Sequence, residues 1–354
     1  MSWMDRVKSG GRRAGIVAVL LSAVIAAGSL RAAAAELVPI RIGLLPTIES
    51  GPLYIAAANG YFKKEGLDAQ VKFFDTEAQL RHAAAAGKLD VALADLDAAL
   101  FADAAKHGFK FIASQASDQS GYPTDALLIG KQAHDAGFRS VKDLPGKRIA
   151  MTAPGAGEQY SLMRIAQRYG LDPNALKLVW LKTPAREIAA LSRGEVDAAA
   201  LPFTTVLKLY DAGKRGGVIK LSDLAQRQRG VVFVRPEAIE ADRSRIEKFV
   251  RAYRRGVTEY DMTFQQRGDE GDVLPGPHFV EYLHLIAQRT KLSPDLLKYA
   301  LAYCDHLARL DLTDIGRQLA FWQSQGLVDQ RVAAADLLDL GFIGEHIRLP
   351  PEAN

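Results

Sequence analysis

The sequence has very little cysteine. Cys304 is its single cysteine among 354 residues, so no disulfide bond can form within the chain. It stands among Leu301, Tyr303 and Leu307, a setting that favours a buried thiol over a reactive one. A disulfide-free chain of this length must be held together by its hydrophobic core, which its size allows.

Sequence signatures of catalysis and of metal binding are also missing. The seven histidines are scattered, and none of them follows a metal-ligand spacing such as H-x-x-x-H. No G-x-S-x-G, P-loop or G-x-G-x-x-G stands at a predicted strand-to-helix turn, since Gly155-Ala156-Gly157 lacks the third glycine. We therefore predict no catalytic residue, no metal site and no cofactor, and we expect that the protein is not an enzyme.

Basic charge is concentrated at the start of the chain. Residues 1–35 carry several basic residues, then the apolar run Ala14–Leu30, and then the small-residue segment Arg31–Ala35. This order is typical of a secretory signal peptide cleaved before Glu36, although a membrane anchor is the alternative. The chain has 45 basic and 41 acidic residues; removing five basic and one acidic residue with this segment leaves 40 of each. A neutral mature chain gives no reason to expect a nucleic-acid partner.

Strand and helix patterns alternate over residues 36–130. The predicted strands are Ile40–Leu45, Ala69–Phe74, Val91–Ala94, Lys110–Ser114 and Ala126–Gly130. The predicted helices are Pro52–Asn59, Glu77–Ala86 and Asp97–Lys106. Strands that alternate with helices of about ten residues indicate an α/β fold with a mainly parallel sheet, covered on both faces.

The same scheme recurs in residues 141–220 at a constant offset, the separation between Arg41 and Arg148. Arg41-Ile42 matches Arg148-Ile149, Gly87-Lys88-Leu89-Asp90 matches Gly194-Glu195-Val196-Asp197, and Thr76 matches Thr183. Such a repeat predicts two similar α/β lobes. The alternative is that any two α/β stretches share such features, but chance similarity would not keep the spacing.

The remainder of the chain is predicted to be helical. We expect the chain to cross between the lobes at Ala126–Gly130 and to return at Gly230–Val234. Residues 241–265 place apolar side chains at helical spacing, which predicts one long helix. Further helices are predicted at His278–Arg289, Pro294–Leu307, Asp314–Gln325 and Val332–Leu338, and this tail is expected to pack on the first lobe. The predicted division is lobe 1 at 36–128 plus 233–354, and lobe 2 at 129–232.

An ordered set of short segments carries a family resemblance. They include Gly51-Pro52-Leu53-Tyr54-Ile55-Ala56, Asn59-Gly60-Tyr61-Phe62-Lys63-Lys64-Glu65-Gly66-Leu67 and Asp143-Leu144-Pro145-Gly146-Lys147-Arg148-Ile149. With these, residues 40–265 resemble the periplasmic solute-binding proteins of ABC importers in the NMT1/THI5-like group, which includes binders of nitrate, sulfonates, taurine and pyrimidine precursors. The resemblance implies a type II-like two-lobed periplasmic-binding-protein fold, with two crossing segments and a solute trapped as the lobes close.

Two facing lobes bring the carboxyl ends of their strands to a shared cleft, so the repeat predicts paired binding loops. Glycines at 155 and 157 would let the backbone approach a ligand, and helix starts present free N–H groups. The alternative for each loop is a plain turn with a helix cap. The predicted ligand-binding residues are Thr47, Glu49, Ser50, Gly51, Thr76, Asp95, Asp97, Tyr122, Thr152, Gly155, Gly157, Gln159, Tyr160, Thr183, Pro202 and Phe203.

Acidic residues near these loops bear on the kind of ligand. Asp97 is either a helix N-cap or a ligand group, whereas Asp95 is not needed as a cap and is the better partner for an ammonium or hydroxyl group. Glu158, in the first turn of a predicted helix, competes with an anionic ligand for the same helix end or caps it. The acids favour a zwitterionic, amine-bearing or heterocyclic solute over nitrate.

The expected function is therefore solute capture for an ABC importer in the periplasm. The expected partners are a small organic solute (a sulfonate, an amine or a heterocycle) and an inner-membrane permease, with the protein itself a monomer. Two alternatives remain open: an exported enzyme acting on a small organic or pyrimidine-like substrate, and a ligand-binding partner of a sensor.

Overall fold

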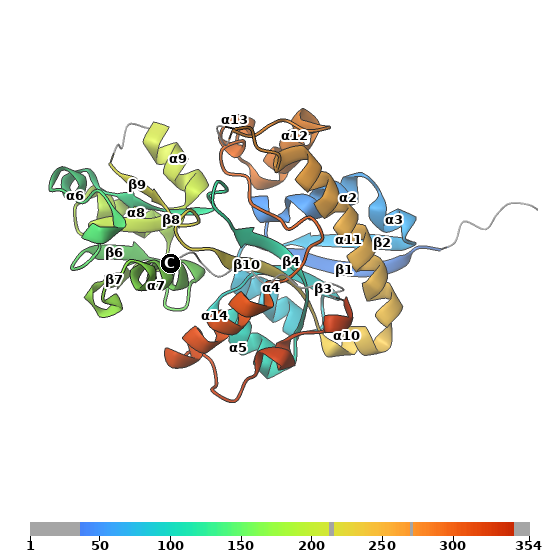
Figure 1. Cartoon of the computed structure of the whole chain (residues 1–354). Coiled ribbons are helices and arrows are strands. Elements are labelled where there is room, and N and C mark those ends of the chain that lie inside the picture. Colours follow the sequence, from blue (N-terminus) through green and yellow to red (C-terminus); the bar gives the residue numbers. More distant parts are fainter. Residues whose placement is uncertain (1–35, 212–215, 270–271, 343–354) are drawn as a thin grey trace, which may run out of the picture. The chain divides into compact units, whose positions relative to one another are not determined.

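The structure is a computed structural model that describes residues 36–211, 216–269 and 272–342. The predicted signal peptide, residues 1–35, lies outside the described residues. Residues from Val38 onward contain two five-stranded sheets flanked by helices (Figure 1), which confirms the predicted α/β class. Within the described part of the chain, no helix is both long enough and apolar enough to cross a membrane.

The two sheets have the same architecture. The first has the order β2-β1-β3-β10-β4 and the second the order β7-β6-β8-β5-β9. In each, the first three strands are parallel, while the fourth pairs antiparallel with both of its neighbours. The strands of the first sheet are β1 (Val38–Leu44), β2 (Leu67–Phe73), β3 (Val91–Asp95), β4 (Lys110–Asp118) and β10 (Arg227–Val234). Those of the second are β5 (Asp125–Ile129), β6 (Arg148–Met151), β7 (Lys177–Trp180), β8 (Ala198–Pro202) and β9 (Val218–Lys220).

The helices predicted by residue range are found in the structure, with two exceptions in the tail, and the structure contains further helices besides them. Those that follow strands of the first sheet or precede the tail are α2 (Gly51–Ala58), α3 (Tyr61–Lys64), α4 (Glu77–Ala85), α5 (Ala98–His107), α10 (Pro236–Ala241) and α11 (Arg243–Phe264). Those among the strands of the second sheet are α6 (Lys131–Asp135), α7 (Gly157–Arg168), α8 (Pro184–Ser192) and α9 (Phe203–Asp211). The tail contains α12 (Phe279–Thr290), α13 (Pro294–Leu297) and α14 (Leu312–Ser324). Short 3₁₀ turns are η1 (Ile48–Ser50), η2 (Val141–Asp143), η3 (Pro173–Ala175), η4 (Ala334–Leu337) and η5 (Leu340–Phe342).

The internal repeat is built as one ion-pair clamp used twice. The carboxylate of Asp90 accepts hydrogen bonds from the backbone N–H of Arg41 (2.8 Å) and from its Nε and Nη2, while Nη1 of Arg41 bonds the carbonyl of Gly87. In the second sheet Asp197 accepts from Arg148 in the same way, with 2.7 Å to the backbone N–H, and Arg148 bonds the carbonyl of Gly194. The clamp ties β1 or β6 to the loop before β3 or β8, and it confirms the predicted internal repeat.

The segments predicted as crossings are strands. Residues 125–129 form β5 within the second sheet, and residues 230–234 belong to β10 within the first. The chain changes sheets just outside these strands, at residues 119–124 and 221–226. The predicted positions of the crossings are wrong because a β-branched run such as Val231–Val234 pairs with a strand on each side, here β3 and β4, and does not connect two sheets. The division into the lobes 36–128 plus 233–354 and 129–232 stays a prediction.

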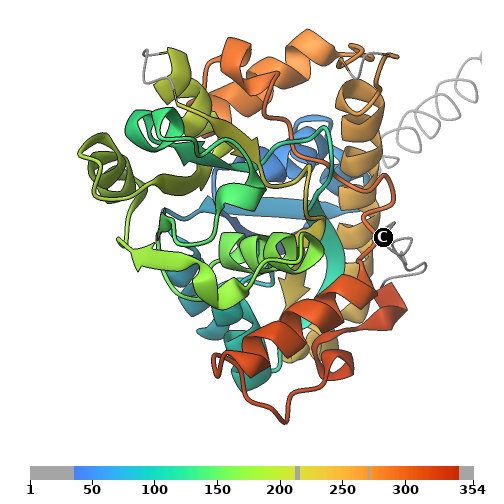
Figure 2. The ribbon, with the colours of Figure 1, turned by 60° about the vertical axis from the view of Figure 1, so that its left-hand side comes forward.

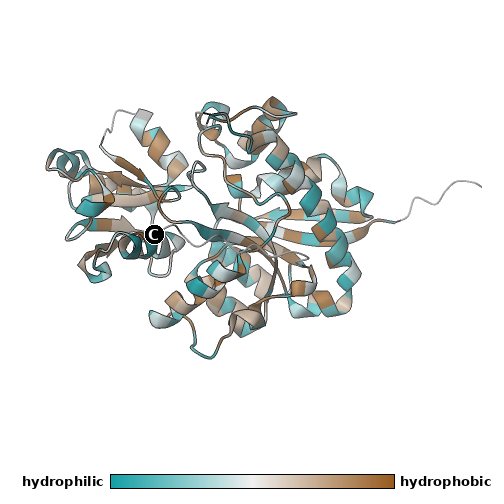
Figure 3. Cartoon of the chain, viewed as in Figure 1, coloured by the Kyte–Doolittle hydropathy of each residue, from teal (hydrophilic) through white to brown (hydrophobic). Residues whose placement is uncertain are grey.

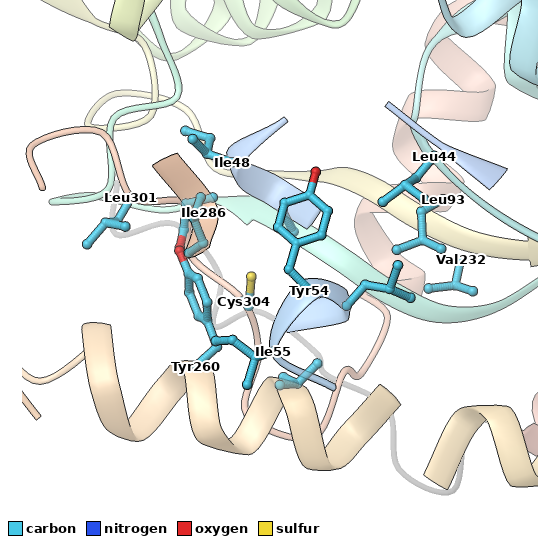
Figure 4. Close-up of a cluster of buried hydrophobic side chains, with 14 of the residues drawn as sticks. Leu44, Ile48, Tyr54, Ile55, Leu93, Val232, Tyr260, Ile286, Leu301 and Cys304 are labelled. Carbon is cyan, nitrogen blue, oxygen red and sulfur yellow. The ribbon is translucent and has the colours of Figure 1, made fainter. Parts of the chain in front are cut away.

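The core of the first sheet is completed by helices α2 and α11. Tyr54 from α2, Tyr260 from α11 and the thiol of Cys304 lie in one buried cluster (Figure 4), so the predicted burial of Cys304 is confirmed. A Cβ at Gly256 would collide with the carbonyl oxygen of Pro52, so a glycine is needed where α11 crosses α2. The hydropathy colouring in Figure 3 shows both teal and brown residues along α11, in keeping with the apolar spacing that predicted an amphipathic helix.

The tail packs on the first sheet, as predicted, but it is less helical than predicted. Helix α14 contacts α5 and β10, and the 3₁₀ turns near the end contact β4. The helix predicted at Pro294–Leu307 is wrong beyond Leu297, and Val332–Leu338 contains only the turn η4. Residues 298–311 instead run along β4, where Ser117 N–H bonds the carbonyl of Tyr303 and Ser114 N–H that of Ala308. These edge-strand hydrogen bonds replace the helical ones.

Candidate functional site

Seven charged side chains meet where the chain passes between the two sheets. Two are guanidinium groups on β10 and five are carboxylates at strand ends or in the first turns of helices. We call this set the charged cluster; it comprises Glu49, Asp95, Asp118, Asp125, Glu158, Arg227 and Arg229. Asp118 ends β4 and Asp125 begins β5, so one crossing contributes two of the acids, and Arg227 begins β10 directly after the other crossing.

Arg229 is the most heavily contacted member of the charged cluster. Its Nε lies 3.1 Å from the carboxylate of Glu49, and its Nη1 forms a close ion pair with Asp125. Asp118 and Asp95 each lie 3.6 Å from this guanidinium. Burial alone would lower the pKa of Arg229, but the surrounding carboxylates raise it well above its usual value.

Arg227 lies beside the start of α7. Its Nε donates to Asp118 at 2.7 Å, and its Nη2 lies 3.6 Å from Asp125. Its Nη1 is buried and has no hydrogen-bond partner among the described residues. A Cβ at Gly157 would collide with this Nη1, so a glycine at the first position of α7 is what lets the guanidinium sit there.

The five carboxylates of the charged cluster outnumber its two guanidinium groups, and this excess of acids affects the pKa values of the carboxylates. Burial and the neighbouring acids raise the pKa of Asp95 and of Asp125, although Arg229 opposes the change. Burial and Asp125 raise the pKa of Glu158 to about 7. For Asp118, burial would raise the pKa, but Arg227 and Arg229 outweigh it and the pKa is lowered. The charged cluster therefore has an acidic excess that the protein itself does not neutralise.

Asp95 is only partly buried, as is Glu158, whereas the other five members of the charged cluster are buried. The side chain of Asp95 keeps 41% of its surface exposed and makes a single contact to a cation, the 3.6 Å pair with Arg229. Two further carboxylates stand beside it. The backbone N–H of Asp95 donates to Glu77, and Asp97 caps α5 by accepting from the backbone N–H of Leu100 at 2.7 Å. The N-cap interpretation of Asp97 is thereby confirmed, and Asp95 is left free of any capping role.

The predicted loop Thr47–Gly51 borders the charged cluster. Ser50 donates to the carbonyl of Leu45 and accepts from the carboxamide of Gln115 at 3.3 Å. Thr47 lies 3.5 Å from the hydroxyl of Ser50, and Gly51 begins α2 against Tyr260. The Oε1 of Gln115 has no hydrogen-bond partner among the described residues and lies 2.6 Å from where a Cβ of Gly230 would be.

The predicted loop Thr152–Gly157 joins the second sheet to the first. The carbonyl of Gly155 accepts from the backbone N–H of Ala98 at 3.0 Å, and the N–H of Gly155 donates to Gln159 at 2.8 Å. Gly155 has a φ of +89°, a conformation that favours glycine. Tyr160 then donates to Asp314 in α14 at 2.8 Å. Figure 2 shows α7, in green, beside α14, in red.

The other predicted ligand residues lie at the edges of this region or serve as caps. Thr76 and Thr183 are exposed and cap α4 and α8. Tyr122, in the first crossing, donates to the carbonyl of Gln265 and lies against Arg267. Phe203 is buried, with its N–H on the carbonyl of Thr124, and Pro202 pairs with Asp125 across two strands.

Sequence reasoning missed Gln115, Asp118, Asp125, Arg227 and Arg229. The predicted site consists of loops after parallel strands, whereas these residues lie on β4 and on the antiparallel strands β5 and β10, most of them at the strand ends next to the crossings. A usable signal was the alternation Arg227-Gln228-Arg229 at the head of an apolar strand, because alternate residues share one face of a strand.

No set of histidine, cysteine and acidic side chains among the described residues has the geometry of a metal site. A cavity of about 850 Å³ does occur in the second sheet's half, lined by Gly130, Arg148 and Leu191 among others. It lies next to the Arg148–Asp197 clamp, at the opposite ends of the strands from the charged cluster.

Comparison with solved structures shows the same fold in several binding proteins. The periplasmic aliphatic sulphonate-binding protein SsuA from Escherichia coli has a TM-score of 0.65 and 17% identity, covering 87% of this chain and 99% of its own. The alkanesulfonate-binding protein SsuA from Xanthomonas axonopodis pv. citri, bound to MOPS, has a TM-score of 0.62 and 20% identity, covering 86% and 99%. The periplasmic nitrate-binding protein NrtA from Synechocystis has a TM-score of 0.51 and 12% identity, covering 74% and 69%.

No curated protein matches the chain in sequence. A family model described as NMT1/THI5 like, however, matches residues 47–262, which is more than half of the chain and includes every member of the charged cluster. The chain therefore belongs to the NMT1/THI5-like family.

Proposed function

We propose that the protein is the periplasmic solute-binding component of an ABC importer, and that it captures a small organic solute between its two sheets without changing it chemically. The observation that carries this proposal is the charged cluster. It gathers loops from both sheets at the two connections between them. The chain belongs to the NMT1/THI5-like family, and several proteins that share its fold are binding proteins.

Capture by hinge closure explains why the cluster lies at the crossings. Rotation of one half against the other about residues 119–124 and 221–226 would open and close the region around Asp95 and Glu158. The contacts Gly155–Ala98 and Tyr160–Asp314 are among those that such an opening would break. A solute that contacts both halves favours the closed form, and a shift from mostly open to mostly closed needs roughly 5 kcal/mol of differential binding.

The expected partners follow from this role. The closed form would dock on an inner-membrane permease, and the protein would act as a monomer in the periplasm after cleavage of residues 1–35. The solute is one of the classes expected from the sequence: a sulfonate, an amine-bearing compound or a heterocycle.

Thermal melting of the purified protein against a panel of sulfonates, amino acids, amines, pyrimidines and aromatic acids tests the proposal. A true solute raises the melting temperature in a concentration-dependent way, because it binds the folded state. Mass spectrometry of the mixture should then recover the solute unchanged. Conversion of the solute to a product would instead identify an enzyme, and no response to any compound would contradict solute capture.

A further inference from the structure

We propose that the solute carries a protonated amine or amidinium group, which binds at Asp95 beside Glu49 in the charged cluster. The inference rests on the proposed function and names the chemical class of its solute. It also separates this protein from the sulfonate- and nitrate-binding proteins that share its fold.

The balance of charge supports a cationic group. The charged cluster has five carboxylates and two guanidinium groups, and both guanidinium groups already face carboxylates from the protein. Glu77 and Asp97 add two more acids beside Asp95. Arg81 is the cation that partly balances them, with its guanidinium group 3.7 Å from the carboxylate of Asp97. An anionic solute would have to displace these acids from the arginines, whereas a cation would neutralise charge that is now in excess.

Asp95 is a carboxylate with room for a ligand. Glu49, Asp118 and Asp125 are buried against Arg227 or Arg229, whereas Asp95 and Glu158 are only partly buried, and the side chain of Asp95 keeps 41% of its surface exposed. Asp95 ends β3, three residues before Ala98, which contacts Gly155 of the second half. A cation held by Asp95 would therefore sit where the two halves touch, and its binding would favour closure.

A buried acceptor without a partner gives a second and independent indication. Gln115 is 3% exposed, and its Oε1 accepts no hydrogen bond from the described residues. Its carboxamide bonds Ser50, the neighbour of Glu49, and its Oε1 lies over Gly230, which pairs with Asp95 across the strands. An N–H donor from the solute would satisfy this oxygen, since an unpaired buried acceptor is costly.

Arg227 does not make the site selective for anions. Its Nε and Nη2 face Asp118 and Asp125, which leaves Nη1 as a single unpartnered donor beside Gly157, among the residues that the structure describes. One donor suits a carbonyl, a ring nitrogen or a carboxylate elsewhere on the same solute. The cation at Asp95 is the feature that we expect every bound solute to share.

Matched pairs of compounds test the inference by thermal melting and calorimetry. The pairs are 4-aminobutanoate and butanoate, taurine and ethanesulfonate, putrescine and 1,4-butanediol, and benzamidine and benzamide. The first member of each pair has the cationic group and the second lacks it. We expect cationic members alone to raise the melting temperature, by about 2 °C or more at saturation.

The variant Asp95→Asn then locates the group. It keeps the shape of the side chain and removes its charge, and we expect the affinity for a cationic solute to fall by about tenfold or more. Glu49→Gln provides a second variant with the same expected direction. Glu237→Gln is the matched control, because Glu237 is 63% exposed and pairs with Arg235 instead of with the charged cluster.

The outcomes separate the two proposals. If amine-free members of the pairs bind as tightly as their cationic partners, or if a folded Asp95→Asn protein binds cationic solutes with unchanged affinity, the inference is overturned while solute capture stands. If no compound from the pairs or from the broader panel binds, and nothing co-purifies, the proposed function fails as well.

Discussion

The first sheet, β2-β1-β3-β10-β4, and the second sheet, β7-β6-β8-β5-β9, share their strand order and one structural clamp, but they differ in the charge that they bring to the crossings. Arg41–Asp90 in the first half and Arg148–Asp197 in the second occupy equivalent positions of the internal repeat. At the same offset, Glu49 corresponds to Ala156 and Asp95 to Pro202.

This difference in charge indicates different roles in solute binding for the half with the first sheet and the half with the second. The first half supplies Glu49, Asp95, Asp118 and both arginines, whereas the second supplies Asp125, Glu158 and the glycine loop at 155–157. A fixed charged surface on one half and close backbone approach on the other would let the first half select a solute and the second half cover it. The two halves therefore share the scaffold, while the first half supplies five of the seven side chains of the charged cluster.

Removing Arg229 should have the largest effect on the charged cluster, the feature in which the two halves differ. Arg229→Met leaves Glu49 and Asp125 buried without their main counter-charge and removes the second cation beside Asp118, and we expect a loss of about 3–5 kcal/mol in the free energy of unfolding at pH 8. Urea denaturation measures it. The loss should be smaller at pH 5, where the acids of raised pKa take up protons. The control is Arg251→Met. Arg251 pairs with Glu65 and is 53% exposed, so its loss should cost under about 1 kcal/mol. Equal costs for the two variants would mean that the charged cluster is not what stabilises this region.

The two clamps should be unequal in strength despite their shared geometry. Asp90 is 4% exposed and also pairs with Arg245 at 3.5 Å, whereas Asp197 is 21% exposed. We expect Asp90→Asn to cost about 2–3 kcal/mol and Asp197→Asn about 1 kcal/mol in unfolding free energy. Burial would raise the pKa of Asp90, but the hydrogen bonds from Arg41 outweigh it and lower the pKa.

A lowered pKa fixes the pH dependence of this prediction. The stabilisation by each clamp is present above the ordinary pKa of an aspartate and is lost as the pH falls below about 4. Chemical denaturation at pH 3 and at pH 7 should therefore show the difference between wild type and Asp90→Asn shrinking at the lower pH. A larger cost for Asp197→Asn than for Asp90→Asn would contradict the ranking by burial.

A buried acid distinguishes the two halves away from the cluster. Glu187 in α8 occupies the position that corresponds to Leu80 in α4; both side chains are fully buried, and neither oxygen of Glu187 has a partner among the described residues. Burial raises its pKa to about 7. We expect Glu187→Leu to stabilise the protein by about 1–3 kcal/mol at pH 8, measured by urea denaturation.

The pH profile checks the cause. Because the folded-state pKa of Glu187 lies above its unfolded value, wild-type stability should fall as the pH rises from about 4.5 to 7, and this slope should be reduced in Glu187→Leu. Glu187→Gln is the matched control: it removes the charge but keeps a polar group, and should recover part of the gain. A destabilised Glu187→Leu protein would show that the carboxyl has a partner that matters.

The sequence predicted what depends on local pattern and on the repeat. Alternation of strands and helices and the constant offset predicted two similar α/β lobes. The landmarks Arg41, Asp90, Arg148 and Asp197 marked the repeat, but the clamps that they form were not predicted. The sequence also did not predict the irregular path of residues 298–311, because their apolar spacing is equally that of a helix until the edge of β4 is there to bond them.

The sequence did not predict the whole charged cluster, for a related reason. Asp95 and Glu49 follow parallel strands, where ligand loops are expected, and the sequence indicated both. Arg227 and Arg229 are far from Asp118 in sequence, and their approach depends on β10 returning to pair between β3 and β4. The alternation Arg227-Gln228-Arg229 places both arginines on one face of a strand, but which strands lie beside that strand is a property of the topology.

The smallest expected effect concerns Thr76 and Thr183, which occupy equivalent positions in the two halves. It tests whether these threonines are helix caps or ligand groups. Thr76 accepts from the backbone N–H of Gln79 at 3.2 Å, and Thr183 from that of Arg186 at 3.3 Å, so each caps its helix in the same way. We expect Thr76→Ala and Thr183→Ala each to cost about 1 kcal/mol in unfolding free energy, while Thr→Ser at either position should cost a few tenths, since serine also caps. Solute affinity should not change in these variants. Weaker solute binding at unchanged stability in either variant would instead assign that hydroxyl to the binding site, where the sequence first placed it.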